Sequence, residues 1–120
     1  MTSKGITYLT DAFLIECLVE RDKTEKVVNA AVEMGAQGAI VNYAEGKGVK
    51  ERMGLLGVTI DSEKSIIRII VSEEQSDQIF KAMSEAAQMN EPGKGIMWIT
   101  SLDKIATHIP EDVLKRVDNE

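Results

Sequence analysis

The residues with the clearest chemical potential in this 120-residue chain are two Gly-Lys-Gly triplets, at 46–48 and 93–95. Glycine tolerates positive φ angles and close approach of the backbone, so consecutive N–H groups can converge on an anion. Nearby lysines add positive charge for phosphate oxygens. The triplets therefore favour a phosphate site with Lys47, Lys50 and Lys94 as candidate cations. Neither has the spacing of a P-loop or a Rossmann fingerprint, and an ordinary surface turn is the competing interpretation.

Catalytic chemistry has weaker support in the sequence. General acid/base work needs a paired set, such as a histidine with a carboxylate or two carboxylates in a cleft. The candidates are Glu16, inside an apolar run, and Asp103 near His108, the only histidine. An inward carboxylate on an edge strand explains Glu16 more simply, and a turn explains Asp103. Cys17 also lies in an apolar run, where a buried, inert thiol is expected. We therefore expect no enzyme.

The charge balance excludes several kinds of partner. Twenty acidic and fourteen basic residues give a net charge of -6. Such a chain repels nucleic acid and anionic membranes. No apolar run approaches the roughly 18 residues that a membrane span needs, so direct membrane insertion is not expected. These features predict a cytoplasmic protein that does not bind nucleic acid.

One structural unit occurs twice in the chain. "VERDKTEKVVNAAVEM" (19–34) aligns without a gap with "VSEEQSDQIFKAMSEA" (71–86), at an offset of 52 residues. Both copies have apolar residues at helical spacing. Asp22 with Glu25 fits reciprocal capping of the first helix. Ser72 with Gln75 fits the same pattern at the start of the second.

Each predicted helix lies between two apolar runs of strand length. The runs are "AFLIECLV" (12–19) and "GAIVNY" (38–43) around the first helix, and "SIIRIIV" (65–71) and "GIMWIT" (95–100) around the second. This βαββαβ order predicts an α+β, ferredoxin-like sandwich: a four-stranded antiparallel sheet with both helices on one face. The other sheet face then needs a cover, which self-association would supply.

The loop between the second and third predicted strands, at residues 45–57, is long for a compact domain. Such loops are more often functional than idle. Its middle carries a charge followed by apolar residues, a composition that suits docking of a partner. The candidate partner-binding residues are Arg52, Met53, Leu55 and Leu56. Folding back onto the chain's own sheet remains the alternative.

Three segments of the chain resemble the PII signal-transduction family. "EMGAQGAIVNYAEGKG" is similar to the family's helix end, second strand and T-loop base. "SIIRIIVSEEQSDQIFKAMSEAA" is similar to its third strand and second helix, and "GKGIMWITSLDKIATHI" to its last strand and extension. The resemblance covers residues 12–109, which leaves 1–11 as an N-terminal extension and 110–120 as a C-terminal tail.

The resemblance implies a homotrimer with an adenine nucleotide in each cleft between subunits. It also implies a regulated target protein, such as a membrane transporter, engaged through the 45–57 loop. The matching positions are Gly38, Ala39, Ile40, Gly46, Gly48, Gly93, Gly95, Thr107 and His108. Together with the three lysines named above, they form the predicted nucleotide site.

Departures from the family pattern bear on the ligand. Val49 and Lys50 occupy the places of an arginine and a magnesium-linked glutamine, which argues against 2-oxoglutarate sensing. Ile96 replaces a phosphate-binding lysine, and Thr107 and Ile109 replace paired arginines. These losses favour ADP, AMP or a cyclic nucleotide over ATP, with ADP and AMP as the first choices and Mg²⁺ as an optional companion. Two alternatives stay open: a CutA-type trimer that binds divalent cations, and a small-anion sensor without nucleotide.

Overall fold

A computed structural model describes residues 2, 3, 5–45 and 63–113 of the chain. Its strands are β1 (Thr2–Ser3), β2 (Ile6–Leu9), β3 (Ala12–Glu20), β4 (Ile40–Glu45), β5 (Glu63–Ser72), β6 (Gly95–Leu102) and β7 (Ile105–Thr107). Its helices are the short η1 (Arg21–Lys23), α1 (Thr24–Glu33) and α3 (Glu73–Ala86). No helix within these residues is long and apolar enough to cross a membrane.

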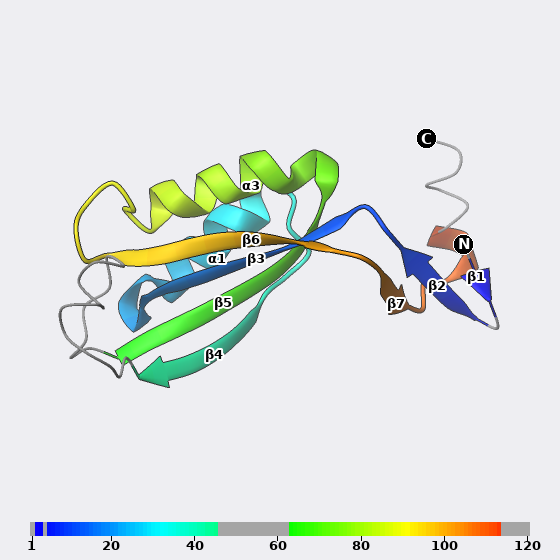
Figure 1. Cartoon of the computed structure of the whole chain (residues 1–120), viewed down its shortest axis with the longest axis horizontal. Helices are drawn as coiled ribbons and strands as arrows, with labels where there is room; N and C mark the ends of the chain where they lie inside the picture. Colours follow the sequence, from blue (N-terminus) through cyan, green and yellow to red (C-terminus); the bar gives the residue numbers. More distant parts are fainter. Residues whose placement is uncertain (1, 4, 46–62, 114–120) are drawn as a thin grey trace.

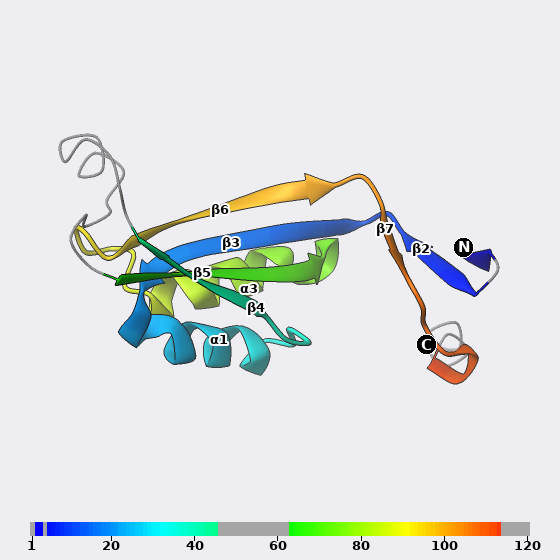
Figure 2. The same ribbon diagram turned by 90° about the horizontal axis from the view of Figure 1, so that it is seen from below.

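The main sheet has the strand order β4-β5-β3-β6, and every neighbouring pair is antiparallel. Helices α1 and α3 pack side by side against one face, and the other face is left open (Figures 1 and 2). The predicted α+β, ferredoxin-like fold is confirmed. The open face results from strand alternation, because successive side chains of a strand point to opposite sides of the sheet.

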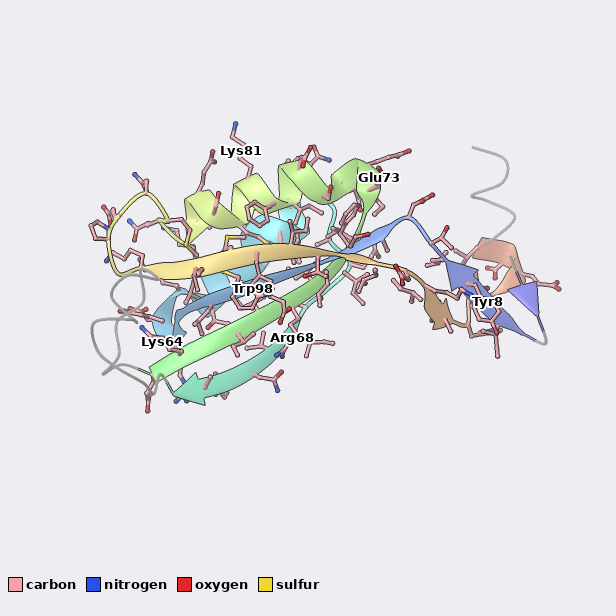
Figure 3. The ribbon with its side chains drawn as sticks, viewed as in Figure 1. Tyr8, Lys64, Arg68, Glu73, Lys81 and Trp98 are labelled. Carbon is pink, nitrogen blue, oxygen red and sulfur yellow. The ribbon has the colours of Figure 1, made fainter. Side chains whose placement is uncertain are left out.

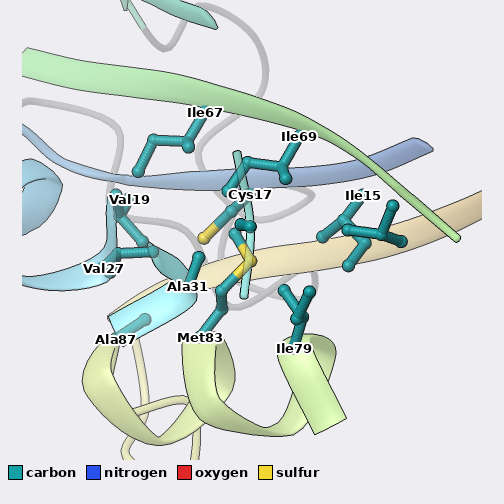
Figure 4. Close-up of a cluster of buried hydrophobic side chains, with 12 residues drawn as sticks. Ile15, Cys17, Val19, Val27, Ala31, Ile67, Ile69, Ile79, Met83 and Ala87 are labelled. Atoms are coloured by element: carbon teal, nitrogen blue, oxygen red, sulfur yellow. The ribbon is translucent and has the colours of Figure 1, made fainter. Parts of the chain in front are cut away.

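The hydrophobic core fills the space between the sheet and the helices (Figure 4). β3 contributes every second residue, namely Ile15, Cys17 and Val19, and all three are fully buried. The helices contribute residues at helical spacing, such as Val27 and Met83. The core is therefore built from alternate residues of the strands and from residues on one stripe of each helix, in line with the periods of two and 3.6 residues.

The two helix starts differ. Ser72 caps α3, since its hydroxyl accepts a hydrogen bond from the Gln75 backbone N–H at 3.3 Å, as the capping pattern predicts. The capping prediction for Asp22 is wrong. That residue lies within η1, and no side chain caps α1, whose N-cap residue is Lys23. The η1 turn moves the N-cap position by one residue, from Asp22 to Lys23, so Asp22 is not in the capping position.

The position of Glu16 in the sheet also differs from the expectation. β3 pairs with β5 on one side and β6 on the other, so it is a central strand and not an edge. Glu16 lies opposite Arg68 of β5 and Trp98 of β6 on the open face. A carboxylate in this place is explained by its partners across the strands.

A second, three-stranded sheet forms an arm that extends from the body (Figures 1 and 2). β2 pairs with β1 and with β7, all antiparallel. β7 lies in the segment that resembles the family's extension after its last strand, but the two N-terminal strands were not predicted. The arm gives the chain an elongated shape, with extents of 50 × 25 × 19 Å.

Candidate functional site

A pocket of about 300 Å³ lies where the chain enters β4. Its lining is largely apolar and comes from three strands and the segment before β4: Leu14, Gln37, Gly38, Ala39, Ile40, Arg68 and Ile70. We call it the β4 pocket. Three of the predicted nucleotide-site residues, Gly38, Ala39 and Ile40, line it together. The volume is at the lower end of the range for small-molecule sites.

The backbone around α1 and β4 explains the opening of this pocket. α1 ends at Glu33, and Gly35 follows its C-cap residue Met34 with a φ of +104° that glycine adopts easily. The chain then runs through the buried Ala36 to the exposed Gly38. A Cβ added at Gly38 would meet nothing within 4 Å. The pocket wall is therefore open at Gly38.

Arg68 is the charged side chain of the β4 pocket and belongs to a hydrogen-bonded row across the sheet (Figure 3). Its Nε donates to Glu16 Oε2 at 3.1 Å, and its Nη1 donates to Asn42 Oδ1 at 2.7 Å. The other oxygen of Glu16 accepts from the Trp98 indole N–H at 2.9 Å. We call these four residues the polar row. It connects all four strands of the main sheet and holds the guanidinium in one orientation.

A second cavity of about 430 Å³ lies between the arm and the body. It shares Gln37 and Ile70 with the β4 pocket, so the two hollows are neighbours. Tyr8 and Ile105 contribute from the arm, and Ser72 and Gln75 contribute from the start of α3. The arm therefore lies beside the β4 pocket.

Gly93, Lys94 and Gly95 lie at the opposite end of the sheet, in the loop that leads into β6 (Figure 1). Gly95 pairs with Val19 near the end of β3. A Cβ at Gly95 would come within 2.3 Å of the Leu18 carbonyl oxygen, so this position requires glycine for packing. Lys94 forms an ion pair with Glu91 at 3.9 Å, and its side chain is about one third exposed.

The two parts of the predicted site are far apart within one chain. Ile40 lies opposite Arg68, which lies in the same cross-strand row as Trp98. Gly95 is three residues before Trp98 on β6, and β6 is three strands away from β4. With rises of about 3.3 Å per residue and about 4.8 Å per strand, the separation is about 17 Å. A single copy therefore does not bring both parts onto one small ligand.

Thr107 and His108 lie in and next to the arm. Thr107 pairs with Thr7 of β2. The His108 Nδ1 is 2.7 Å from the Gly5 carbonyl oxygen, a contact in which the ring nitrogen donates. These two residues are thus on the side of the β4 pocket and not on that of Gly93–Gly95.

Further basic side chains, which the sequence analysis did not single out, gather near the Gly95 end of the sheet. Lys64 is buried and lies 3.8 Å from a Glu20 carboxylate oxygen. Arg21 is 3.0 Å from Glu63 and stacks over the Tyr43 ring at 4.5 Å from its centroid. Their charges are balanced by neighbouring carboxylates.

The remaining predicted site residues lie outside the described part of the chain. They are Gly46, Lys47, Gly48 and Lys50 of the nucleotide site, and Arg52, Met53, Leu55 and Leu56 of the partner-binding loop. Glu45 and Glu63 are the described residues on either side of that segment. The predictions for the loop therefore remain predictions.

Sequence reasoning missed Arg68, Leu14 and Ile70 as pocket residues. The signal that could have found them is the alternation of the open face. β3 presents Leu-Glu-Leu-Glu at positions 14, 16, 18 and 20, and β5 presents Ile-Arg-Ile-Lys at the opposite positions 70, 68, 66 and 64. Opposite charges placed directly across a strand pair stabilise it. Reading the two runs as partners predicts the Glu16–Arg68 contact.

The described residues give no support for a metal site or for a reactive thiol. No group of three or more histidine, cysteine or carboxylate side chains gathers within them. Cys17 is buried in the core, and this burial raises the pKa of its thiol from 9.0 to about 12. The thiolate, which is the reactive form, is therefore scarce at neutral pH.

The sequence and the fold of this chain were compared with those of known proteins. Residues 12–111 match the profile of a family described as Nitrogen regulatory protein P-II. The fold is similar to the crystal structure of Arabidopsis thaliana PII bound to citrate, with a TM-score of 0.60 and 19% sequence identity. The similarity covers 78% of this chain and 79% of that one. Comparison with curated proteins gave no match.

Proposed function

Because this chain belongs to the Nitrogen regulatory protein P-II family, we propose that it is a homotrimeric signalling protein that binds an adenine nucleotide between neighbouring copies. The base would occupy the β4 pocket of one copy. The phosphates would lie on Gly93, Lys94 and Gly95 of the next copy. The unplaced Gly46, Lys47, Gly48 and Lys50 complete the proposed phosphate side.

The observation that carries this proposal is the separation of the two half-sites by about 17 Å, at opposite ends of one sheet. A ligand that contacts both must lie between two copies docked head to tail. Head-to-tail interfaces close into rings when the rotation between copies permits. The membership of a P-II family supports a closed ring of three copies as the assembly.

The chemistry of the β4 pocket supports a purine base. Apolar side chains from β3, β4 and β5 make a surface for a flat ring. The planar Arg68 guanidinium borders this surface, and arginine stacks favourably on aromatic faces such as a purine ring. Thr107 and His108 belong to the arm and line neither this pocket nor the cavity beside it, and we propose that they approach the ligand from the arm.

The phosphate side of the proposed site favours a ligand with few phosphate charges. Lys94 is already paired with Glu91, and Ile96 is apolar where the family resemblance predicts a lysine. A triphosphate needs more cationic partners than this side offers. We therefore favour ADP or AMP over ATP, with Mg²⁺ as an optional companion.

Regulation of a target protein is proposed to act through residues 45–57, which begin at the last residue of β4 and precede β5 in the sequence. The nucleotide would contact Gly46 and Gly48 at one end of this segment, so binding can change which conformation is populated. Arg52, Met53, Leu55 and Leu56 would then engage or release the target. We propose a membrane transporter as the target and the cytoplasm as the setting.

Isothermal titration of the purified protein with AMP, ADP, ATP and cyclic AMP, with and without Mg²⁺, tests the nucleotide proposal. Citrate, which the similar plant PII carries in its crystal structure, serves as a non-nucleotide anion. The expected result is micromolar binding of ADP or AMP at one site per copy. Binding of citrate or a divalent cation with no nucleotide binding would replace the proposal with a small-anion or CutA-like function.

A further inference from the structure

The open face of the main sheet has a layered pattern that a nucleotide pocket alone does not require. Leu14 and Ile70 form one apolar cross-strand row, and Leu18 lies with Ile66 and Ile96 in another. Between these rows lie Glu16, Arg68 and Trp98 of the polar row, whereas its fourth member, Asn42, lies opposite Ile66 on β4. An ion pair therefore sits in the middle of an apolar surface.

The polar row is partly shielded even in one copy. The Glu16 side chain is 17% exposed, and the Arg68 side chain is 35% exposed. Both carboxylate oxygens of Glu16 are used, one by Arg68 and one by the Trp98 indole. The Arg68 Nη2 and the Asn42 amide N–H groups have no hydrogen-bond partner within the described residues. Asn42 is exposed and the Arg68 side chain is 35% exposed, so water can satisfy these donors in a single copy.

We propose that the polar row sets the register in which copies of this chain dock through their open sheet faces. This inference rests on the self-assembly proposed above, and its occupant is a second copy of the chain. Covering the apolar rows removes water from the polar row as well. The free donors of Arg68 and Asn42 must then meet acceptors on the second copy, or each is left buried without a partner. Only a docking geometry that supplies those acceptors is favourable.

A buried polar group in an apolar interface is known to act in this way. A single polar residue in a coiled-coil seam fixes register and oligomeric state at a cost in stability. Replacing a buried ion pair by apolar residues often preserves or raises stability, whereas removing one partner is strongly destabilising. The two kinds of variant therefore separate a register role from a general contribution to stability.

The test compares two variants by native mass spectrometry and sedimentation, with circular dichroism as the check on folding. The double variant Glu16→Leu/Arg68→Met is expected to associate but to give several assembly masses instead of one. The single variant Arg68→Met leaves the Glu16 charge unpaired, and the dissociation constant of the assembly is expected to rise about 100-fold or more.

The matched control carries the same pair of changes on the opposite side of the molecule. Lys81 and Glu85 are exposed residues of α3, and Figure 3 shows Lys81 pointing away from the sheet. Lys81→Met/Glu85→Leu is expected to keep the assembly mass and dissociation constant of the unmodified protein. A control variant that also gives mixed masses would overturn the inference, because the effect would then be a general result of added apolar surface.

The outcomes separate this inference from the proposed function. A homogeneous trimer from the double variant would overturn the register role and leave the trimeric sensor intact. An unmodified protein that is monomeric would overturn both. If the double variant does not fold, Glu16→Gln replaces it. That variant leaves the Arg68 charge unpaired, and an assembly as tight as that of the unmodified protein would contradict the inference.

Discussion

At the scale of single residues, two glycines of the predicted site have different physical reasons for being glycine. Gly38 faces open space, so its small size keeps the β4 pocket accessible. Gly95 lies against the Leu18 carbonyl oxygen, where a Cβ would be 2.3 Å away. The first glycine bears on ligand binding, and the second bears on the pairing of β6 with β3.

Substitution separates these roles. Gly38→Leu is expected to weaken ADP binding at least tenfold with little change in the free energy of unfolding, because the side chain occupies the pocket. Gly95→Ala is expected to lower the unfolding free energy by about 1–3 kcal/mol, because the backbone must shift. Calorimetric titration and urea denaturation measure the two effects. Asn29→Leu, on the exposed side of α1, is the control for added apolar surface. Strong destabilisation by Gly38→Leu would contradict this division.

The buried thiol gives a second residue-scale prediction. Burial raises the pKa of Cys17 to about 12, so the folded protein is expected to resist thiol reagents at pH 8 and to react fully in denaturant. Above pH 9.0, the unfolded thiol ionises while the folded one stays protonated. The contribution of Cys17 to stability is therefore present below that pH and lost as pH rises toward 12. Rapid labelling of the folded protein at pH 8 would contradict the burial.

At the scale of elements, the two helices illustrate how capping depends on the backbone before them. The sequence offers an acceptable capping residue ahead of each helix, but only Ser72 accepts a backbone N–H. The η1 turn moves Asp22 away from α1. α3 therefore has a side-chain cap, and α1 depends on its packing against α3 and the sheet.

Paired substitutions test this difference. Ser72→Ala is expected to lower the free energy of unfolding by about 1 kcal/mol, because the Gln75 N–H loses its acceptor. Asp22→Ala is expected to change it by less than about 0.5 kcal/mol. Urea denaturation followed by circular dichroism measures both. Equal effects of the two substitutions would contradict the assigned cap.

Much of the main sheet and both helices could be predicted, because the repeated unit carries both periodicities in its sequence. The strand-length runs at 12–19 and 65–71 are rich in branched apolar side chains. The segments between the predicted strands carry apolar residues at helical spacing. The arm could not be predicted in this way. β2 is four residues long and pairs with a strand almost a hundred residues later, and such pairing leaves little local signal. Arg68 was missed because its role depends on register with Glu16 and Asn42.

At the scale of the whole molecule, the arm makes this chain less compact than its length requires. Its radius of gyration is 16.6 Å, whereas about 14 Å is typical of a 120-residue domain. The arm strands are two, four and three residues long, and β1 and β2 lie before the region that matches the family. Such a small sheet has little core of its own.

The rates of backbone hydrogen exchange are therefore expected to differ between the arm and the main sheet. Backbone amides of β2 and β7 should exchange much faster than those of β3 and β5, which pair along the full length of the main sheet. Mass spectrometry of peptic fragments measures the difference. Equal protection of the arm and the sheet would mean that the arm gains cover from another copy, and a dilution series would show this as protection that depends on concentration.

Native mass spectrometry of the protein with increasing ADP tests the central claim most directly, since it reports assembly and occupancy in one spectrum. The account predicts a trimer that takes up as many as three ADP molecules, because each nucleotide needs the β4 pocket of one copy and Gly93–Gly95 of the next. A monomer that binds ADP, or a trimer that remains empty at millimolar ADP, would contradict it.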